Sequence, residues 1–167
     1  MDRQILFSTG ESVLGGVLVA RSDRGVCAIL LGDDPSELER DLRQRFPHDE
    51  VCNAYVGLEP LVAEVARFLA APRTPLELPL DLRGSEREVR VWNALREIAP
   101  GATETYSEVA QRLGAEATAK EVGEACAANP LAVAVPCHRV LRMDGGLGGY
   151  RWGLRRKRAL LERERSA

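Results

Sequence analysis

The sequence predicts an α/β part over residues 1–80, followed by a mainly helical part over residues 81–167. Short apolar runs separated by turn residues open the chain, which is typical of strands joined by hairpins. After Gly84 the apolar positions instead recur at helical spacing. Between these patterns, Ala71–Pro75 and Pro79 indicate an extended connection stiffened by proline. We therefore expect the domain boundary in this connection.

Residues 5–31 predict a small meander of strands. The turns are expected where small and polar residues cluster, at Ser8–Gly10, Gly15–Gly16 and Ser22–Gly25. A helix is then expected to start after Asp34, with Leu38, Leu42 and Phe46 on its apolar face and Pro47 at its end. A second helix is expected over residues 58–71. Strands followed by helices make this an α/β part.

The second part predicts three helices in its first half. Val89, Trp92 and Leu95 share one helical face, and the pattern ends at residues 99–101. Thr105 is a good N-cap for a helix over residues 106–113, and Gly114 separates this helix from another over about residues 118–128. Helix, glycine turn and helix are the spacing of a helix-turn-helix, although an ordinary helical hairpin has the same pattern.

Length and composition indicate a folded chain whose charge is divided unevenly. Its 167 residues are 45% hydrophobic, enough for a core, and the net charge is −2. Residues 1–83 carry 9 basic and 14 acidic side chains, whereas residues 84–167 carry 14 and 11, and residues 139–165 carry 9 and 3. A polyanion would therefore meet the second part, although a solvated arginine-rich helix would give the same count.

The four cysteines are not spaced as a metal site. Cys27, Cys52, Cys126 and Cys137 form no CxxC pair, so we do not expect zinc. The chain shows no signal-peptide pattern and no apolar run long enough to span a bilayer. A reducing cytoplasm is the expected setting, and a free reactive thiol fits it.

One cysteine has the surroundings of a nucleophile. Cys137 and His138 are adjacent and follow an apolar run, Leu131–Val135, that is expected to be a strand. A thiol attacks as the thiolate, so a histidine that accepts its proton would activate it. The pair alone is weak evidence, because most buried cysteines act as small apolar residues.

The sequence around this pair resembles the O6-alkylguanine-DNA alkyltransferases, especially the methyltransferase half of bacterial adaptive-response proteins. The stretches that carry the resemblance are Pro136–Val140, Cys126–Pro130, Gly148–Gly153, Gly101–Tyr106, Lys157–Glu164, Gly25–Asp34 and Leu80–Trp92. The resemblance implies a ribonuclease H-like α/β domain before a winged helix-turn-helix domain. It also implies a monomer that binds duplex DNA through the minor groove and flips the damaged base out.

The resemblance also implies a reaction and the residues that perform it. One alkyl group would pass irreversibly, without a cofactor, from O6-methylguanine or O4-methylthymine in DNA to Cys137. His138 would be the base, linked to the thiol through a water, and Glu164 would orient it. The DNA-binding or base-binding residues implied by the match are Tyr106, Lys120, Asn129, Arg139, Val140, Tyr150 and Arg151. Arg151 would act through its backbone N–H.

Two positions depart from the family pattern. Lys120 stands where the family has an arginine that replaces the flipped base, and lysine lacks the planar group that stacks on bases. Glu121 and Glu124 add negative charge to the same helix, and Glu124 could pair with Lys120. Arg87 replaces a phenylalanine that is expected to pack inside. These changes keep three alternatives open: a protein that binds alkylated DNA without repairing it, a helix-turn-helix regulator and a Cys-His-Glu hydrolase.

Overall fold

The computed structural model describes residues 4–54, 56–72, 76–114 and 117–166, which form two compact units. The first unit ends at Leu82 and also includes Pro130–Ala132, and the second comprises Arg83–Asn129 and the chain from Val133 onward. Of the expected proline-rich connection, residues 73–75 lie outside the described residues. Among the described helices, none combines the length and the apolar composition needed to cross a bilayer.

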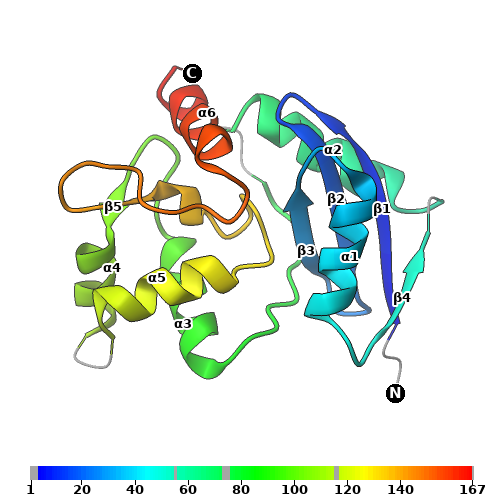
Figure 1. The fold of residues 1–167 in the computed structure, drawn as a ribbon, viewed down its shortest axis with the longest axis horizontal. Helices are drawn as coiled ribbons and strands as arrows, with labels where there is room; N and C mark the ends of the chain where they lie inside the picture. The colour runs from blue at the N-terminus through cyan, green and yellow to red at the C-terminus, as the bar shows by residue number, and fades with distance from the viewer. Residues whose placement is uncertain (1–3, 55, 73–75, 115–116, 167) are drawn as a thin grey trace. The chain divides into compact units, whose positions relative to one another are not determined.

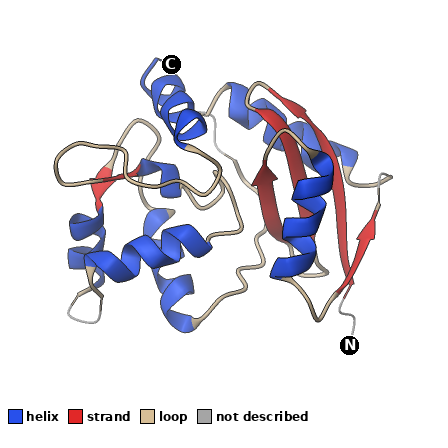
Figure 2. Ribbon diagram, viewed as in Figure 1, coloured by secondary structure: helices blue, strands red, loops and turns tan. Residues whose placement is uncertain are grey.

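The first unit is built on a four-stranded sheet with the strand order β3-β2-β1-β4 (Figures 1 and 2). The expected meander is confirmed, since β1, β2 and β3 pair as antiparallel neighbours. The short fourth strand, which the sequence pattern did not indicate, pairs parallel to β1. The strands are β1 (Gln4–Ser12), β2 (Gly15–Arg21), β3 (Val26–Leu31) and β4 (Glu50–Asn53).

The turn expected at Ser8–Gly10 is wrong, because these residues continue β1. Gly10 pairs with Val17 of β2, in register with its neighbours. A Cβ atom at Gly10 would lie 2.6 Å from Cγ1 of Val62 in helix α2 (Glu59–Ala70). Glycine therefore lets the helix approach the strand closely here, and it does not mark a chain reversal.

Two helices cover the sheet of the first unit. Helix α1 (Pro35–Arg45) starts as expected, because the side chain of Asp34 accepts a hydrogen bond from the Ser36 backbone N–H at 2.9 Å. In Figure 1, α1 lies in front of the sheet and α2 behind it. The interior of β2, Gly16–Ala20, is buried at every position. Successive side chains of a strand point to opposite faces, so continuous burial agrees with cover on both sides.

The second unit is mainly helical, as expected. Its first three helices each begin with a capping box, in which Ser85, Thr105 and Thr118 exchange hydrogen bonds with the glutamate three residues later. The elements are α3 (Glu86–Leu95), β5 (Glu104–Thr105), α4 (Tyr106–Leu113), α5 (Ala119–Ala128), the 3-10 helix η1 (Cys137–Arg139), β6 (Val140–Leu141) and α6 (Leu154–Ser166). Strands β5 and β6 pair in parallel, which brings the start of α4 beside the chain that follows η1.

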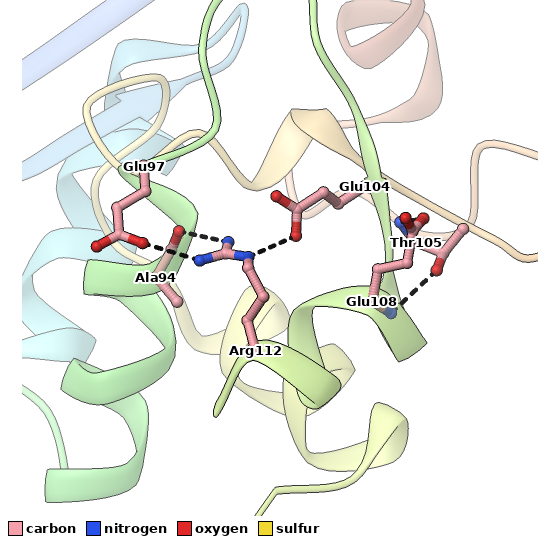
Figure 3. Close-up of polar contacts among 6 residues, drawn as sticks. All are labelled: Ala94, Glu97, Glu104, Thr105, Glu108 and Arg112. Carbon is pink, nitrogen blue, oxygen red and sulfur yellow. Dashed lines mark hydrogen bonds and ion pairs between the residues drawn. The ribbon is translucent and has the colours of Figure 1, made fainter. Parts of the chain in front are cut away.

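Arg112 ties the end of α4 to the end of α3 and to β5 (Figure 3). Its guanidinium donates to the Ala94 carbonyl and to carboxylate oxygens of Glu97 and Glu104, each at 2.8 Å. These contacts cross-link three elements around the Thr105 N-cap of α4. The helix-turn-helix is thus anchored through its first helix.

The apolar run Leu131–Val135 is not the expected strand. Only Leu131 forms a bridge, to Ile29 of β3, and Ala132 donates to the Ile29 carbonyl at 2.9 Å. Residues 132–134 are turns, and Val133 has a φ of +62°, which is costly for a β-branched residue. The run is apolar because its residues are buried while the chain turns. The contacts with Ile29 of β3 explain why Pro130–Ala132 belongs to the first unit.

Candidate active site

Cys137 opens η1 on the wall of a cavity of about 390 Å³ in the second unit. The wall also carries two tyrosines, a second cysteine, an arginine and small residues. The lining consists of Tyr106, Gly123, Cys126, Ala127, Cys137, Gly149, Tyr150 and Arg151. The cavity therefore brings the predicted nucleophile together with three of the residues that the family resemblance placed at the base, Tyr106, Tyr150 and Arg151.

The thiol of Cys137 is buried and is held by Asn129. The side-chain amide of Asn129 donates to Cys137 Sγ at 3.3 Å and to the Val135 carbonyl at 3.0 Å. Burial raises the pKa of the Cys137 thiol, and the Asn129 hydrogen bond and the charges of Lys157 and Arg151 oppose this rise only in part. The resting group is thus a thiol at neutral pH, and its attack requires a base. Asn129 itself is fully buried, so it shapes the site from inside.

The side chains of His138, Glu164 and Arg139, next to Cys137 in the second unit, form a buried hydrogen-bond network. His138 Nε2 lies 2.7 Å from Glu164 Oε1, with the two side chains 0% and 1% exposed. Arg139 Nε lies 2.9 Å from Glu164 Oε1 and 3.1 Å from Oε2, and Arg139 Nη1 donates to the Ile98 carbonyl at 2.7 Å. The Gly101 backbone N–H completes the shell of Glu164 at 3.4 Å. The structure thus joins Glu164 to two adjacent residues that lie 26 and 25 positions before it in the chain.

The charges in this hydrogen-bond network determine which ring nitrogen of His138 can accept a proton. Burial favours the neutral form of Glu164, but hydrogen bonds from His138 and Arg139 and their positive charges outweigh it and lower its pKa to about 2. Burial lowers the pKa of His138 and outweighs the attraction of Glu164, so the imidazole is neutral at pH 7. An ionised carboxylate only accepts hydrogen bonds, so Nε2 carries the proton. His138 Nδ1, buried and without a hydrogen-bond partner among the described residues, is then the basic nitrogen.

Lys157, which was not among the predicted site residues, is buried at the foot of the site. Its Nζ donates to the carbonyls of Val140 at 2.7 Å and Gly149 at 3.2 Å, and also to that of Leu147. A lysine ammonium has three donors, which suits three converging carbonyls better than a planar guanidinium would. Lys157 thereby joins α6 and β6 to the glycine-rich loop of residues 145–153. Its charge also favours the thiolate of Cys137. The signals in the sequence were its place at the start of the Lys157–Glu164 stretch of the resemblance and the fact that the chain has just two lysines, Lys120 and Lys157.

The glycine-rich loop passes close to Tyr106. A Cβ atom at Gly148, whose φ is +70°, would lie 2.8 Å from the Tyr106 hydroxyl oxygen. Only glycine allows both this approach and this backbone conformation. The hydroxyl of Tyr150 is buried with no hydrogen-bond partner in the described part of the chain, and burial raises its pKa well above the ordinary value. Tyr150 is therefore a protonated donor on the cavity wall.

Arg139, Val140 and Lys120 are placed differently from what direct contact with a base requires. The side chains of Arg139 and Val140 are buried. The Arg139 guanidinium is bound to Glu164, and the Val140 carbonyl accepts a hydrogen bond from Lys157. The Arg139 side chain thus contacts Glu164 and the Ile98 carbonyl, and its contact with DNA stays a prediction. Lys120 is exposed on the first turn of α5 and does not line the cavity.

Arg87, one of the two departures from the family pattern, pairs with Glu121. Arg87 Nη1 of α3 lies 2.5 Å from Glu121 Oε2 of α5, and Glu121 also closes the capping box with Thr118. The negative charge that Glu121 was expected to add to this helix is paired with Arg87. The structure records no ion pair between Lys120 and Glu124 among the described residues. Within the same residues, no group of three histidine, cysteine or acidic side chains could hold a metal ion.

Family models and relatives match the chain along nearly its whole length. The ribonuclease-like domain of 6-O-methylguanine DNA methyltransferase matches residues 5–82, and the DNA binding domain of the same family matches residues 86–166. A methylated-DNA--protein-cysteine methyltransferase from Mycolicibacterium paratuberculosis is 46% identical over 96% of this chain and 93% of its own length. The bifunctional transcriptional activator/DNA repair enzyme Ada of Escherichia coli is also 46% identical over 96% of this chain.

The fold has solved counterparts. The crystal structure of Mycobacterium tuberculosis OGT in complex with DNA is similar with a TM-score of 0.81 and 34% identity, covering 96% of this chain and 93% of that one. The chain spans only 45% of the length of Ada and of its Salmonella typhimurium counterpart. The expected order of an α/β ribonuclease-like domain and a helical DNA-binding domain is confirmed. The chain belongs to the 6-O-methylguanine DNA methyltransferase family.

Proposed function

We propose that the chain repairs DNA by moving the alkyl group of O6-methylguanine, and of O4-methylthymine, to Cys137 in a single turnover. The observation that carries the proposal is the buried Cys137 thiol on a cavity wall, backed by the chain of His138, Glu164 and Arg139. This arrangement has the parts of a nucleophile, a base and an orienting carboxylate. Arg139 adds a fourth part, because it keeps Glu164 ionised.

The proposed reaction begins with loss of the thiol proton. His138 Nδ1 takes this proton, directly or through a water, and the imidazolium that forms is stabilised by Glu164 at Nε2. Cys137 Sγ attacks the methyl carbon, so that an S–C bond forms while the C–O6 bond breaks and its electron pair passes to guanine. Asn129 and Lys157 stabilise the thiolate while it exists. The thioether product is a poor leaving group, so the protein serves once.

The leaving guanine has to gain a proton, and Tyr106 is the proposed donor. Tyr106 lines the cavity, and burial raises its pKa, so its hydroxyl is protonated at neutral pH. Tyr106 then takes up a proton from solvent and His138 releases the one that it accepted, so the thiol proton ends in net terms on guanine and the sum of the reaction is neutral. The Arg151 backbone N–H and the Tyr150 hydroxyl are the proposed contacts of the base.

We infer that the second unit binds duplex DNA from the minor groove and that a nucleotide is flipped into the cavity. The helix-turn-helix of α4 and α5 and the basic excess of residues 84–167 support this. Lys120 is the proposed residue that fills the vacated place in the base stack. Arg87 supports the approach to phosphates by neutralising Glu121. A cytoplasmic location follows from the DNA substrate and from the four free cysteines, which need reducing conditions.

The experiment is incubation of the protein with duplex DNA carrying methyl-labelled O6-methylguanine, followed by peptide mapping. We expect at most one label per molecule, on the peptide that contains Cys137, and none in Cys137→Ala, which should still bind the DNA. Cys126→Ala is the matched control, since it removes the other thiol of the same cavity. Label retained by Cys137→Ala, or release of methanol with multiple turnover, would contradict the proposal. DNA binding without any labelling would favour a protein that recognises damage without repairing it.

A further inference from the structure

Among the residues that the structure describes, the cavity lining contains one cation and no acid. Of its lining residues only Arg151 is charged at neutral pH, since the tyrosines and cysteines are held in their neutral forms. Lys157 adds a second positive charge behind the wall, where three carbonyls bind it. Any group that enters beside Cys137 therefore meets a positive potential.

Arg151 is an exposed residue of the cavity lining, and two contacts orient its side chain. Its Nη1 donates to the Asn129 carbonyl at 3.1 Å, and its guanidinium carbon lies 5.5 Å from the centre of the Trp152 ring. Asn129 is the same residue whose amide contacts Cys137 Sγ at 3.3 Å. One asparagine thus positions both the sulfur and the guanidinium, and the charge of Arg151 favours the thiolate.

We propose that Arg151 makes the site select O6-alkyl groups that end in a carboxylate, such as carboxymethyl, over neutral groups of the same size. The inference rests on the proposed transfer to Cys137. A guanidinium binds a carboxylate through charge-assisted N–H···O bonds that a primary amide of the same shape forms less strongly.

The transfer of such a group is balanced in the same way as methyl transfer. Cys137 Sγ attacks the methylene carbon, the S–C bond forms, and the C–O6 bond breaks with its electron pair passing to guanine. The thiol proton ends on guanine. The products are S-carboxymethylcysteine at position 137 and unmodified guanine, and the carboxylate remains unchanged.

The experiment compares two duplex oligonucleotides of one sequence, carrying O6-carboxymethylguanine or its neutral isostere O6-carbamoylmethylguanine. Single-turnover rate constants are measured for the wild type, Arg151→Gln, Arg151→Lys and Arg155→Gln. Arg155, an exposed cation of α6 that does not line the cavity, is the control for general loss of charge. The quantity to compare is the ratio of the carboxymethyl rate to the carbamoylmethyl rate, because intrinsic reactivity and base flipping cancel between variants.

We expect Arg151→Gln to lower this ratio by about threefold to fivefold, the range of a partly exposed ion pair. Arg151→Lys should keep most of the ratio, and Arg155→Gln should not change it. In the wild type the ratio should fall as the salt concentration rises from about 0.05 M to about 0.5 M, which tests the same charge without a substitution.

An unchanged ratio in Arg151→Gln, or an equal loss of rate on both substrates, would overturn the inference. The second result would mean that Arg151 acts on DNA binding or on the shape of the cavity. Wild-type transfer from O6-methylguanine is measured in parallel. Its absence would defeat the proposed function itself, whereas methyl transfer with an unchanged ratio defeats only the role of Arg151.

Discussion

Replacing Glu164 by glutamine should destabilise the protein strongly at neutral pH, because it leaves the buried guanidinium of Arg139 without a counter-charge. Arg139 and Glu164 form a side-on pair with three N···O distances between 2.7 and 3.1 Å, and both side chains are almost completely buried. Removing one partner of such a pair costs about 3–5 kcal/mol. The same contacts lower the pKa of Glu164 from 4.5 to about 2, which corresponds to about 3 kcal/mol at pH 7.

The pH dependence gives this prediction its sign. The pKa of Glu164 is lower in the folded state than in the unfolded state, so its contribution is fully present above the unfolded value of 4.5. As the pH falls from 4.5 towards about 2, the carboxylate takes up a proton first in the unfolded state, and the contribution disappears. The difference in free energy of unfolding between wild type and Glu164→Gln should therefore shrink across this window.

The assay is urea denaturation followed by circular dichroism at a series of pH values from 7 down to the lowest at which the wild type folds. Glu124→Gln is the matched control, because Glu124 is an exposed glutamate of the same unit. The control should differ from the wild type by less than about 0.5 kcal/mol at every pH. A Glu164→Gln difference that stays constant as the pH falls, or that is no larger than the control, would refute the argument that Arg139 holds this carboxylate ionised.

Three further predictions concern transfer and DNA binding. His138→Ala and the double variant His138→Ala/Glu164→Gln should slow methyl transfer by similar factors, because members of one catalytic unit are not additive, and losses that multiply in single-turnover rates would argue against the relay. Lys120→Arg should speed repair of duplex DNA severalfold but leave the rate on free O6-alkylguanine nearly unchanged, since only duplex DNA requires base flipping. Equal acceleration on both substrates would mean that Lys120 does not fill the base stack. Arg87→Gln should weaken duplex DNA binding in a fluorescence titration, because it leaves the charge of Glu121 unpaired. The double variant Arg87→Gln/Glu121→Gln should restore the affinity for DNA. A double variant that binds no better than the single one would show that the pair has no such role.

Short-range signals determined the helices well. Thr105 and Thr118 cap α4 and α5 because a threonine side chain satisfies backbone N–H groups only three residues away, and Gly114 separates the helices with its positive φ. The strands before Leu31 were also predictable, because alternation and turn residues are local. The failures at Ser8–Gly10 and Leu131–Val135 have one cause. Gly10 admits helix α2, and the second run turns inside the core, and neither role depends on neighbouring residues.

The proposed nucleophile and base, Cys137 and His138, could be named from the sequence because they are neighbours within the stretch that carries the family resemblance. The partners that make them work come from elsewhere in the chain. Glu164 was assigned only through the family resemblance, and Lys157 was missed, because a buried cation that binds carbonyls looks like one more charge of a basic helix. Arg139 was expected at the DNA, although its surroundings turn it towards Glu164. The sequence determines which side chains lie near each other along the chain. Burial and the packing of distant elements determine the protonation states of those side chains and their hydrogen-bond partners.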